Sequence, residues 1–213
     1  VSGTGTLFKL NPPTDLAFAN AAVTCTAPTT SVTLTATNGV GTLQYETIAP
    51  SVAIVAKQTS NVFAGLASGS YTFRVTDANG CYYTESYTIT PVTPIAVTAT
   101  KLTDVDCFGS TTGSARFTVS NSSGGPGSYT VVTSPVIPPA QIAISGNVYT
   151  ITGLANGTYT FSVTDNTTGC TDSKSVIISQ PTAALGVTIV SNKNANCNVA
   201  TARVEVIAAG GTP

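Results

Sequence analysis

An internal repeat constrains the fold more than any other feature of this sequence. The segment 65–81 reads GLASGSYTFRVTDANGC and the segment 153–170 reads GLANGTYTFSVTDNTTGC, which differs in length by a single turn residue. The correspondence continues outward, since Cys25 matches Cys107, Tyr45 matches Tyr129 and Pro91 matches Pro181. Repetition at such a period indicates that one structural unit is built more than once.

The repeat predicts three segments. Residues 1–91 form the first repeat, with a core from about residue 14, residues 92–181 form the second, and residues 182–213 are the opening strands of an interrupted third. The spacing from Pro181 to Cys197 equals the spacing from Pro91 to Cys107 and supports this assignment. Because the sequence contains no methionine, we expect it to be a segment of a longer secreted protein.

Each repeat is expected to be all-β. Charged residues make up only 8% of the chain, whereas Thr, Ser, Val and Ala, which include the β-branched residues that favour strands, are abundant. Apolar residues alternate with polar ones around Tyr71, Phe73 and Val75, which is the period of a half-buried strand. The second repeat has seven such runs, near 94–101, 113–120, 128–133, 140–145, 147–152, 157–165 and 170–179. Seven short strands in about 90 residues predict an immunoglobulin-like β-sandwich, so the chain as a whole is expected to contain tandem sandwiches.

A glycine-rich motif precedes the aromatic strand of both repeats. The pattern Gly-Leu-x-x-Gly-x-Tyr ends at Tyr71 and Tyr159, and it resembles the Tyr corner of Greek-key sandwiches, in which the hydroxyl bonds to upstream backbone. We therefore assign both tyrosines to the architecture. Asp77 and Asp165 open the turn that follows, and we assign them to turn formation.

Five cysteines fall within the repeat pattern. Each complete repeat has one cysteine before its second strand and one after its last turn, which predicts disulfides Cys25–Cys81 and Cys107–Cys170 and leaves Cys197 without a partner in this sequence. Structural zinc is disfavoured, because there is no histidine and no close cysteine pair, while free buried cysteines remain the alternative. Disulfides would place the protein outside a reducing cytosol.

Composition argues against several functions. A net charge of −1 with scattered Lys and Arg does not favour nucleic acid, and no apolar run is long enough for a spanning helix. Without histidine, Ser-His-Asp and Cys-His catalysis are impossible. Hydrolysis by two carboxylates stays formally open, but Asp77 and Asp165 are assigned to turns, so we expect no enzyme. We also expect no cofactor. Asp104 and Asp106 are weak calcium candidates, with a solvated loop as the alternative.

Tyr82 and Tyr83 are candidates for stacking on a sugar. Only one of two neighbouring strand residues can face inward, and the second repeat has Thr171 and Asp172 in their place. An edge-strand aromatic pair without a ligand is the alternative.

The second repeat resembles a known family. Its segments CFGSTTG (107–113), GLANGTYT (153–160), VTD (163–165) and ISQP (178–181) look like the SprB repeat of large surface adhesins of gliding Bacteroidota. The first repeat departs at Cys25-Thr26-Ala27, which lacks the glycine after the cysteine. The resemblance implies an outer-membrane-associated cell-surface filament that is exported by type IX secretion, takes part in gliding motility and attaches to a substratum.

The expected function is therefore a tandem-repeat stalk segment of a cell-surface adhesin, whose partners are neighbouring repeats and a surface polysaccharide or substratum. Two alternatives stay open. One is a polysaccharide-binding or spacer module of a secreted protein. The other is a pilus-like subunit in which residues 182–213 act as a donated strand.

Overall fold

The computed structural model describes residues 10–198 and 201–211. Its regular elements are β-strands apart from two single turns of 3₁₀ helix, so the all-β prediction is confirmed. The chain divides into two compact units, Val1–Pro94 with Thr168–Cys170, and Ile95–Thr167 with Thr171–Pro213. The predicted boundary after residue 91 lies three residues before the end of the first of these ranges.

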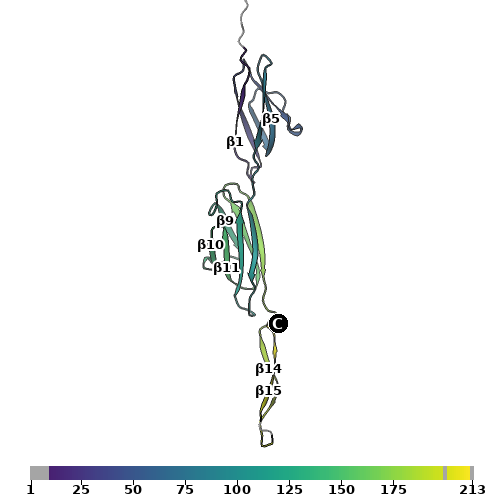
Figure 1. The fold of residues 1–213 in the computed structure, drawn as a ribbon, viewed down its shortest axis with the longest axis vertical. Coiled ribbons are helices and arrows are strands. Elements are labelled where there is room, and N and C mark those ends of the chain that lie inside the picture. The colour runs from purple at the N-terminus through teal and green to yellow at the C-terminus, as the bar shows by residue number, and fades with distance from the viewer. Residues whose placement is uncertain (1–9, 199–200, 212–213) are drawn as a thin grey trace, which may run out of the picture. The chain divides into compact units, whose positions relative to one another are not determined.

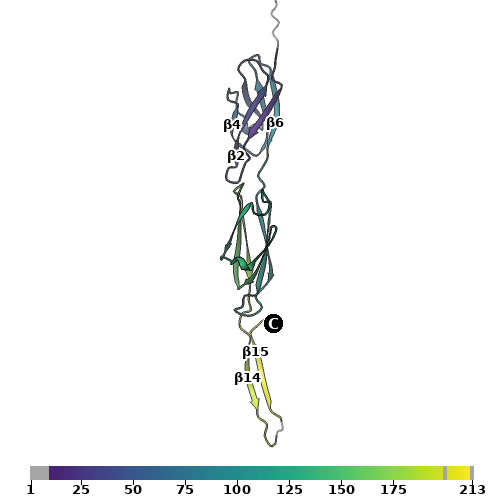
Figure 2. The same cartoon turned by 90° about the vertical axis from the view of Figure 1, so that its left-hand side faces the viewer.

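The first unit contains two three-stranded antiparallel sheets (Figures 1 and 2). One sheet has the order β1-β2-β4 and the other has the order β3-β5-β6. The strands are β1 (Asp15–Asn20), β2 (Thr29–Thr37), β3 (Gln44–Ala49), β4 (Val62–Ala67), β5 (Gly69–Thr76) and β6 (Tyr82–Ile89).

The two sheets of the first unit bury one core between them. Alternate residues of β5, namely Tyr71, Phe73 and Val75, point into it as the period of two predicts. The Phe73 ring lies 5.1 Å from the ring of Phe63 on the opposite sheet, in the edge-to-face geometry that aromatic pairs favour. This packing of sheet on sheet makes the unit a β-sandwich.

One segment of the first unit replaces a strand. Residues that follow β3 form a 3₁₀ turn (Ser51–Ala53) and then return along β3, where Gln58 bridges Tyr45. The buried Thr47 hydroxyl donates to the Ala53 carbonyl and accepts from the Val55 amide, both at 2.6 Å. The segment is thus held on the edge of β3, and among the described residues the sandwich of the first unit has six strands where the sandwich of the second unit has seven.

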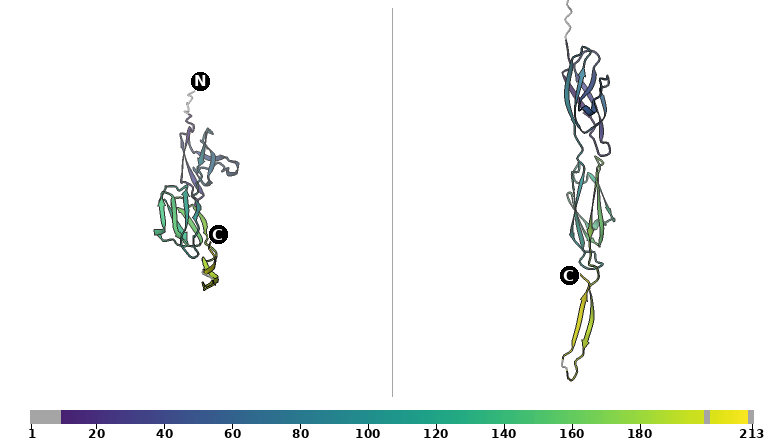
Figure 3. Two further views of the ribbon diagram at one scale, coloured as in Figure 1. Left: turned by 60° about the horizontal axis from the view of Figure 1, so that its bottom comes forward. Right: turned by 90° about the vertical axis from the view of Figure 1, so that its right-hand side faces the viewer.

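The second unit has the strand arrangement of an immunoglobulin constant-type domain. One sheet has the order β10-β11-β8-β7 and the other has the order β13-β12-β9, and the two layers are visible in Figure 3. The strands are β7 (Ala96–Thr103), β8 (Gly113–Ser120), β9 (Tyr129–Ser134), β10 (Ile142–Ser145), β11 (Val148–Leu154), β12 (Gly157–Asp165) and β13 (Thr171–Ile178), with a 3₁₀ turn (Pro139–Gln141) before β10. All seven predicted strands are present, and the immunoglobulin-like assignment is confirmed.

Stacked phenylalanines join the two sheets of the second unit. Phe117 on β8 and Phe161 on β12 are each almost fully buried, with ring centroids 4.8 Å apart. Phe161 occupies the same place in its strand as Phe73 does in β5. The repeated sequence therefore builds the same core position twice.

The predicted third segment forms a hairpin of β14 (Gly186–Lys193) and β15 (Arg203–Ala209). One face carries Val187, Ile189, Val204 and Val206, each more than half exposed. Val187 corresponds to Val97 of β7 in the repeat, and Val206 corresponds to Phe117 of β8. Those two positions are buried in the second unit, whereas the described residues provide no second sheet to cover this face of the hairpin. Within the described part of the chain, no helix is long and apolar enough to cross a membrane.

We predict that Phe161→Ala lowers the free energy of unfolding of the second unit by about 3–5 kcal/mol, because it leaves a cavity between the two sheets. Ile177→Ala, on a side chain of β13 that is 65% exposed, is the matched control and should change that free energy by less than about 1 kcal/mol. Denaturant unfolding followed by circular dichroism measures both. Equal effects of the two substitutions would contradict the core assignment.

Candidate functional site: the loop and turn cysteines

The two tyrosines of the glycine-rich motif close the corner before the aromatic strand. The Tyr71 hydroxyl donates to the Ala67 carbonyl at 3.0 Å, and the Tyr159 hydroxyl donates to the Ala155 carbonyl at 3.2 Å. Each bond runs from a strand to the residue four positions upstream, as in a Tyr corner. These hydroxyls are therefore engaged in holding the corner.

A buried aspartate shapes the turn after that strand in each unit. Asp77 accepts hydrogen bonds from the amides of Asn79 and Cys81, both at 2.9 Å, and from the amide of Val40. Asp165 accepts from the amides of Thr167 and Ser123. Burial of a carboxylate is tolerated here because amide hydrogen bonds replace water. The aspartate thus fixes the turn that carries a cysteine.

The other cysteines lie between the first two strands of each repeat. Cys25 lies between β1 and β2, Cys107 lies between β7 and β8, and Cys197 lies between β14 and β15. We call these three the loop cysteines, and we call Cys81 and Cys170 the turn cysteines. Two residues before Cys25 and Cys107, Val23 and Val105 are buried and anchor the loop.

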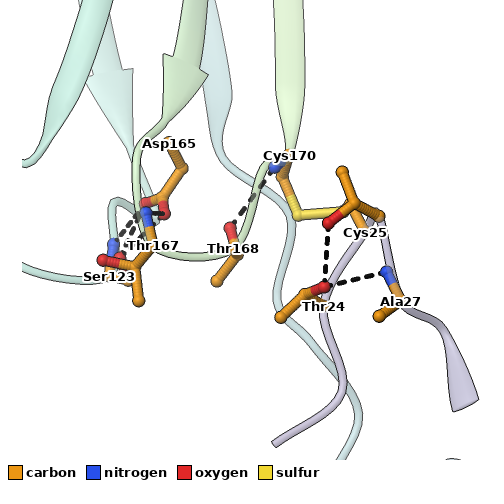
Figure 4. The surroundings of a disulfide bond; sticks show 9 residues. Thr24, Cys25, Ala27, Ser123, Asp165, Thr167, Thr168 and Cys170 are labelled. Atoms are coloured by element: carbon orange, nitrogen blue, oxygen red, sulfur yellow. Dashed lines mark hydrogen bonds between the residues drawn. A yellow bond between two sulfur atoms is a disulfide. The ribbon is translucent and has the colours of Figure 1, made fainter.

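Within the described ranges there is one disulfide, which joins loop cysteine Cys25 to turn cysteine Cys170 (Figure 4). Their Cα atoms lie 5.0 Å apart, within the range that a disulfide requires. The Cys25 amide also donates to the Thr168 carbonyl at 3.0 Å, and residues 168–170 group with the first unit. Gly169 lies so close to Thr26 that an added Cβ would come within 2.7 Å of the Thr26 side chain. The bridge therefore connects cysteines of two different sequence repeats.

This pairing corrects the expected Cys25–Cys81 bridge, and the reason is the length of β2. Cys25 precedes β2, whereas Cys81 lies on the turn that bonds to Val40, three residues after β2 ends. A strand of nine residues spans roughly 26 Å, several times the Cα separation of a disulfide. The two cysteines of the first repeat thus lie at opposite ends of its sandwich.

The expected Cys107–Cys170 bridge fails for the same reason. Cys107 precedes β8, and the turn with Cys170 bonds through Asp165 to Ser123, three residues after β8 ends. The eight residues of β8 separate the two by roughly 23 Å. Among the described residues, Cys81, Cys107 and Cys197 are free thiols, of which Cys107 and Cys197 are exposed and Cys81 is half-buried.

Asp104, one of the two calcium candidates, anchors the loop that carries Cys107. Its carboxylate accepts hydrogen bonds from the Lys101 ammonium and from the Ser179 amide, both at 2.7 Å. The Lys101 hydrogen bond and then the Ser179 amide lower the pKa of Asp104. Its carboxylate oxygens are thus already engaged.

The other calcium candidate, Asp106, uses its backbone amide to donate to the Thr112 hydroxyl at 2.9 Å. Within the described ranges, no three His, Cys, Asp or Glu side chains gather where they could hold a metal ion.

The Tyr82–Tyr83 pair divides between surface and core. Tyr83 packs against the core of the first unit, whereas Tyr82 is 64% exposed. The Arg74 guanidinium lies over the Tyr82 ring at 5.1 Å, so one face of this ring is occupied by a cation.

An apolar groove of 420 Å³ lies on the second unit between β9 and β10, with Val132, Ile137, Ile144 and Tyr149 among its lining residues. The Tyr149 hydroxyl donates to the Tyr129 hydroxyl. Burial and this hydrogen bond raise the pKa of Tyr129. The groove offers no ionised group for acid–base chemistry.

Asp172 connects the two sheets of the second unit. Its Oδ2 accepts from the Val97 amide of β7 at 2.8 Å, and this hydrogen bond is the largest of the effects that lower the pKa of Asp172. Because the folded pKa lies below its ordinary value, the ionised form stabilises the folded state above about pH 4. That contribution is lost as the pH falls through the folded pKa.

We predict that Asp172→Asn destabilises the second unit at neutral pH and that the difference from the native sequence shrinks as the pH falls from about 4 through the lowered pKa of Asp172, because the carboxylate then becomes protonated. Thermal unfolding across this pH range measures the effect. A difference that stays constant with pH would contradict the role of the ionised carboxylate.

We predict that non-reducing peptide mapping recovers a Cys25–Cys170 cross-link and no Cys25–Cys81 cross-link. Cys25→Ser should lower the melting temperature, because the bridge closes a loop with a sequence separation of 145 residues and thereby restricts the unfolded chain. Cys81→Ser is the matched control, since it removes a free thiol and leaves the bridge intact. A larger loss from Cys81→Ser than from Cys25→Ser would contradict the observed pairing.

No protein-family model and no curated protein matches this chain. Solved structures of the surface-layer protein SbsC are similar in fold. A structure of its domains 1–6 is 15% identical, with a TM-score of 0.39, over 93% of this chain and 37% of that one. A crystal structure of SbsC residues 31–844 is 14% identical, with a TM-score of 0.37, over 95% of this chain and 37% of that one. The SbsC domains 4 and 5 are 14% identical, with a TM-score of 0.33, over 78% of this chain and 98% of theirs. This chain thus spans just over a third of the length of the first two.

Proposed function

We propose that this chain is a load-bearing stalk segment of a large cell-surface adhesin of the SprB-repeat type, and that it has no catalytic activity. The observation that carries the proposal is the Cys25–Cys170 bridge between two sequence repeats. A binding module or an enzyme needs only that each domain is stable. A disulfide within one domain would be enough for that, and a disulfide between repeats is not required. A bridge from one repeat to the next has a further consequence when the chain is pulled.

The bridge changes the covalent path through which tension passes. A force applied to the two ends of the chain runs from the N-terminal residues to Cys25, across the disulfide to Cys170, and on to the C-terminal residues. Residues 26–169 lie outside this path, so they are not stretched while the bridge is intact. Most of both sandwiches is therefore shielded from the force that the stalk transmits.

The rest of the chemistry supports a structural role at the cell surface. Disulfides persist in oxidising surroundings such as the cell exterior. The buried carboxylates and the Tyr corner hydroxyls are occupied by hydrogen bonds within the fold. Among the described residues, the ion pairs are Arg74–Glu46 between neighbouring strands, Lys101–Asp104 at the end of β7 and Lys174–Asp172 within β13, so each lies inside one unit. Export by type IX secretion and a part in gliding motility belong to the proposal through the resemblance to SprB repeats.

We predict that single-molecule stretching of the native chain releases much less length than its residue count allows. The bridge withholds the 145-residue separation between Cys25 and Cys170, which corresponds to roughly 500 Å of extended chain. Cys25→Ser or a reducing agent should restore that length in the unfolding traces. Cys107→Ser is the matched control and should leave the native trace unchanged.

Equal contour lengths for the native chain and Cys25→Ser would contradict the load-bearing proposal. Binding of the native chain to a purified polysaccharide, with no difference in contour length between these variants, would favour the polysaccharide-binding alternative.

A further inference from the structure

We propose that the free thiols Cys81 and Cys107 are complementary halves of further bridges of the Cys25–Cys170 kind, in which a loop cysteine of one repeat joins a turn cysteine of another. The biological purpose of these bridges rests on the proposed stalk function, whereas the expectation that they form does not. The chemistry follows from the repeat, because Cys107 occupies the position of Cys25 and Cys81 occupies the position of Cys170. The partner of Cys107 is therefore a turn cysteine that follows an Asp-opened turn, and the partner of Cys81 is a loop cysteine.

The turn that carries Cys81 resembles the turn that carries the disulfide-bonded Cys170. Asp77 holds the Cys81 amide as part of the same kind of aspartate-centred turn that Asp165 forms before Cys170. The residue before each turn cysteine is a glycine with positive φ, +82° at Gly80 and +67° at Gly169. An added Cβ at Gly169 would meet Thr26, whereas nothing lies within 4 Å of the same position at Gly80. The turn of the first unit thus offers an open surface where the bonded turn holds its partner's loop.

The loop that carries Cys107 is likewise held in place. The Val105 amide donates to the Ser179 carbonyl at 2.9 Å, and the Gly109 amide donates to the Gln180 side chain at 3.0 Å. Buried Val105 takes the place of Val23 in the bonded loop. Cys107 itself is exposed, so its sulfur is accessible to another thiol or disulfide.

Neither free cysteine can be satisfied within its own sandwich. Strands β2 and β8 keep the loop cysteine and the turn cysteine of one repeat at opposite ends, as shown above. A bridge between unlike positions of two repeats is heterologous, and such contacts extend into a chain instead of closing into a pair. The loop–turn rule therefore predicts a series of bridges along successive repeats.

Bridge formation requires an oxidant, which we take to be a low-molecular-weight disulfide such as oxidised glutathione. The Cys107 thiolate attacks this disulfide, forms a mixed disulfide and expels one small thiolate. The Cys81 thiolate of the partner then attacks the Cys107 sulfur and expels the second. Two protein thiols lose two protons and two electrons in total, and the small disulfide is reduced to two small thiols.

The test uses two full-length variants that keep the Cys25–Cys170 bridge and one free thiol each. Cys107→Ser with Cys197→Ser leaves Cys81, and Cys81→Ser with Cys197→Ser leaves Cys107. The two proteins, one of them labelled with ¹⁵N, are mixed in equal amounts in a glutathione redox buffer, and the dimers are resolved by mass spectrometry. Random pairing would give about two mixed dimers for each homodimer of either kind, whereas we expect the mixed Cys81–Cys107 dimer to exceed each homodimer by about tenfold or more.

A random ratio of dimers would overturn the proposal, since it would show that the Cys81 and Cys107 thiols have no preference for each other. One further experiment shows whether the turn cysteine that bonds to Cys107 belongs to the next repeat of the same chain or to a second molecule. In a chain in which residues 92–181 are inserted a second time after Pro181, a bridge from Cys107 to the turn cysteine of the inserted copy would identify the next repeat as the partner. Mixed dimers without this internal bridge would identify a second molecule as the partner.

Absence of both products would refute the inference. It would leave the stalk proposal standing, because the stretching experiment depends on Cys25–Cys170 alone.

Discussion

The length of a β-strand decides which cysteines of this protein can meet. In each sandwich the second strand runs the full height of the core, with a loop cysteine before it and the cysteine-bearing turn beside its far end. A disulfide tolerates a Cα separation of less than about 7 Å, so a strand of eight or nine residues forbids the bridge within a repeat. The loop cysteine and the turn cysteine of one repeat therefore cannot bond to each other, and each needs a partner outside that repeat. The bridge between repeats and the remaining free thiols agree with this distance, and the proposed shielding of residues 26–169 from tension depends on it.

Most of the fold could be predicted from the sequence because its signals are local. Alternation around Phe73 and Phe161 marks the core faces, and the glycine-rich motif before Tyr71 and Tyr159 marks the corner, since each pattern is set by neighbouring residues. The predicted disulfide pairing is wrong because the true pairing depends on which end of the sandwich each cysteine occupies. That information was within reach, because the first loop and the last turn of a Greek-key sandwich lie at opposite ends. The spacing in the sequence suggested that the two cysteines of one repeat lie close together, whereas the topology places them at opposite ends of the sandwich.

Other differences came from interactions that the sequence pattern does not express. The segment after β3 has no alternation, and its position depends on the buried hydroxyl of Thr47 bonding to Ala53 and Val55. Asp104 is a weak calcium candidate in the sequence because acidic residues near a junction can hold a cation, and in the structure its carboxylate accepts hydrogen bonds from Lys101 and the Ser179 amide. In both cases a single polar side chain satisfies backbone groups that would otherwise be unpaired. Such pairing is set by the tertiary fold and is not visible in one repeat of sequence.

Disulfides between a loop cysteine and a turn cysteine of different repeats also limit how far a row of repeats can be stretched by force. Under the proposed rule, tension crosses from a loop cysteine to the turn cysteine of the next repeat and then follows the backbone to the next loop cysteine. In this chain that backbone stretch runs from Cys170 to Cys197, with 26 residues between them, or roughly 90 Å when fully extended. Each bridge bypasses a far longer stretch, the 145-residue separation between Cys25 and Cys170. A stalk built in this way would keep a bounded length even if its sandwiches unfolded, because the length is set by covalent bonds instead of by the stability of any one domain.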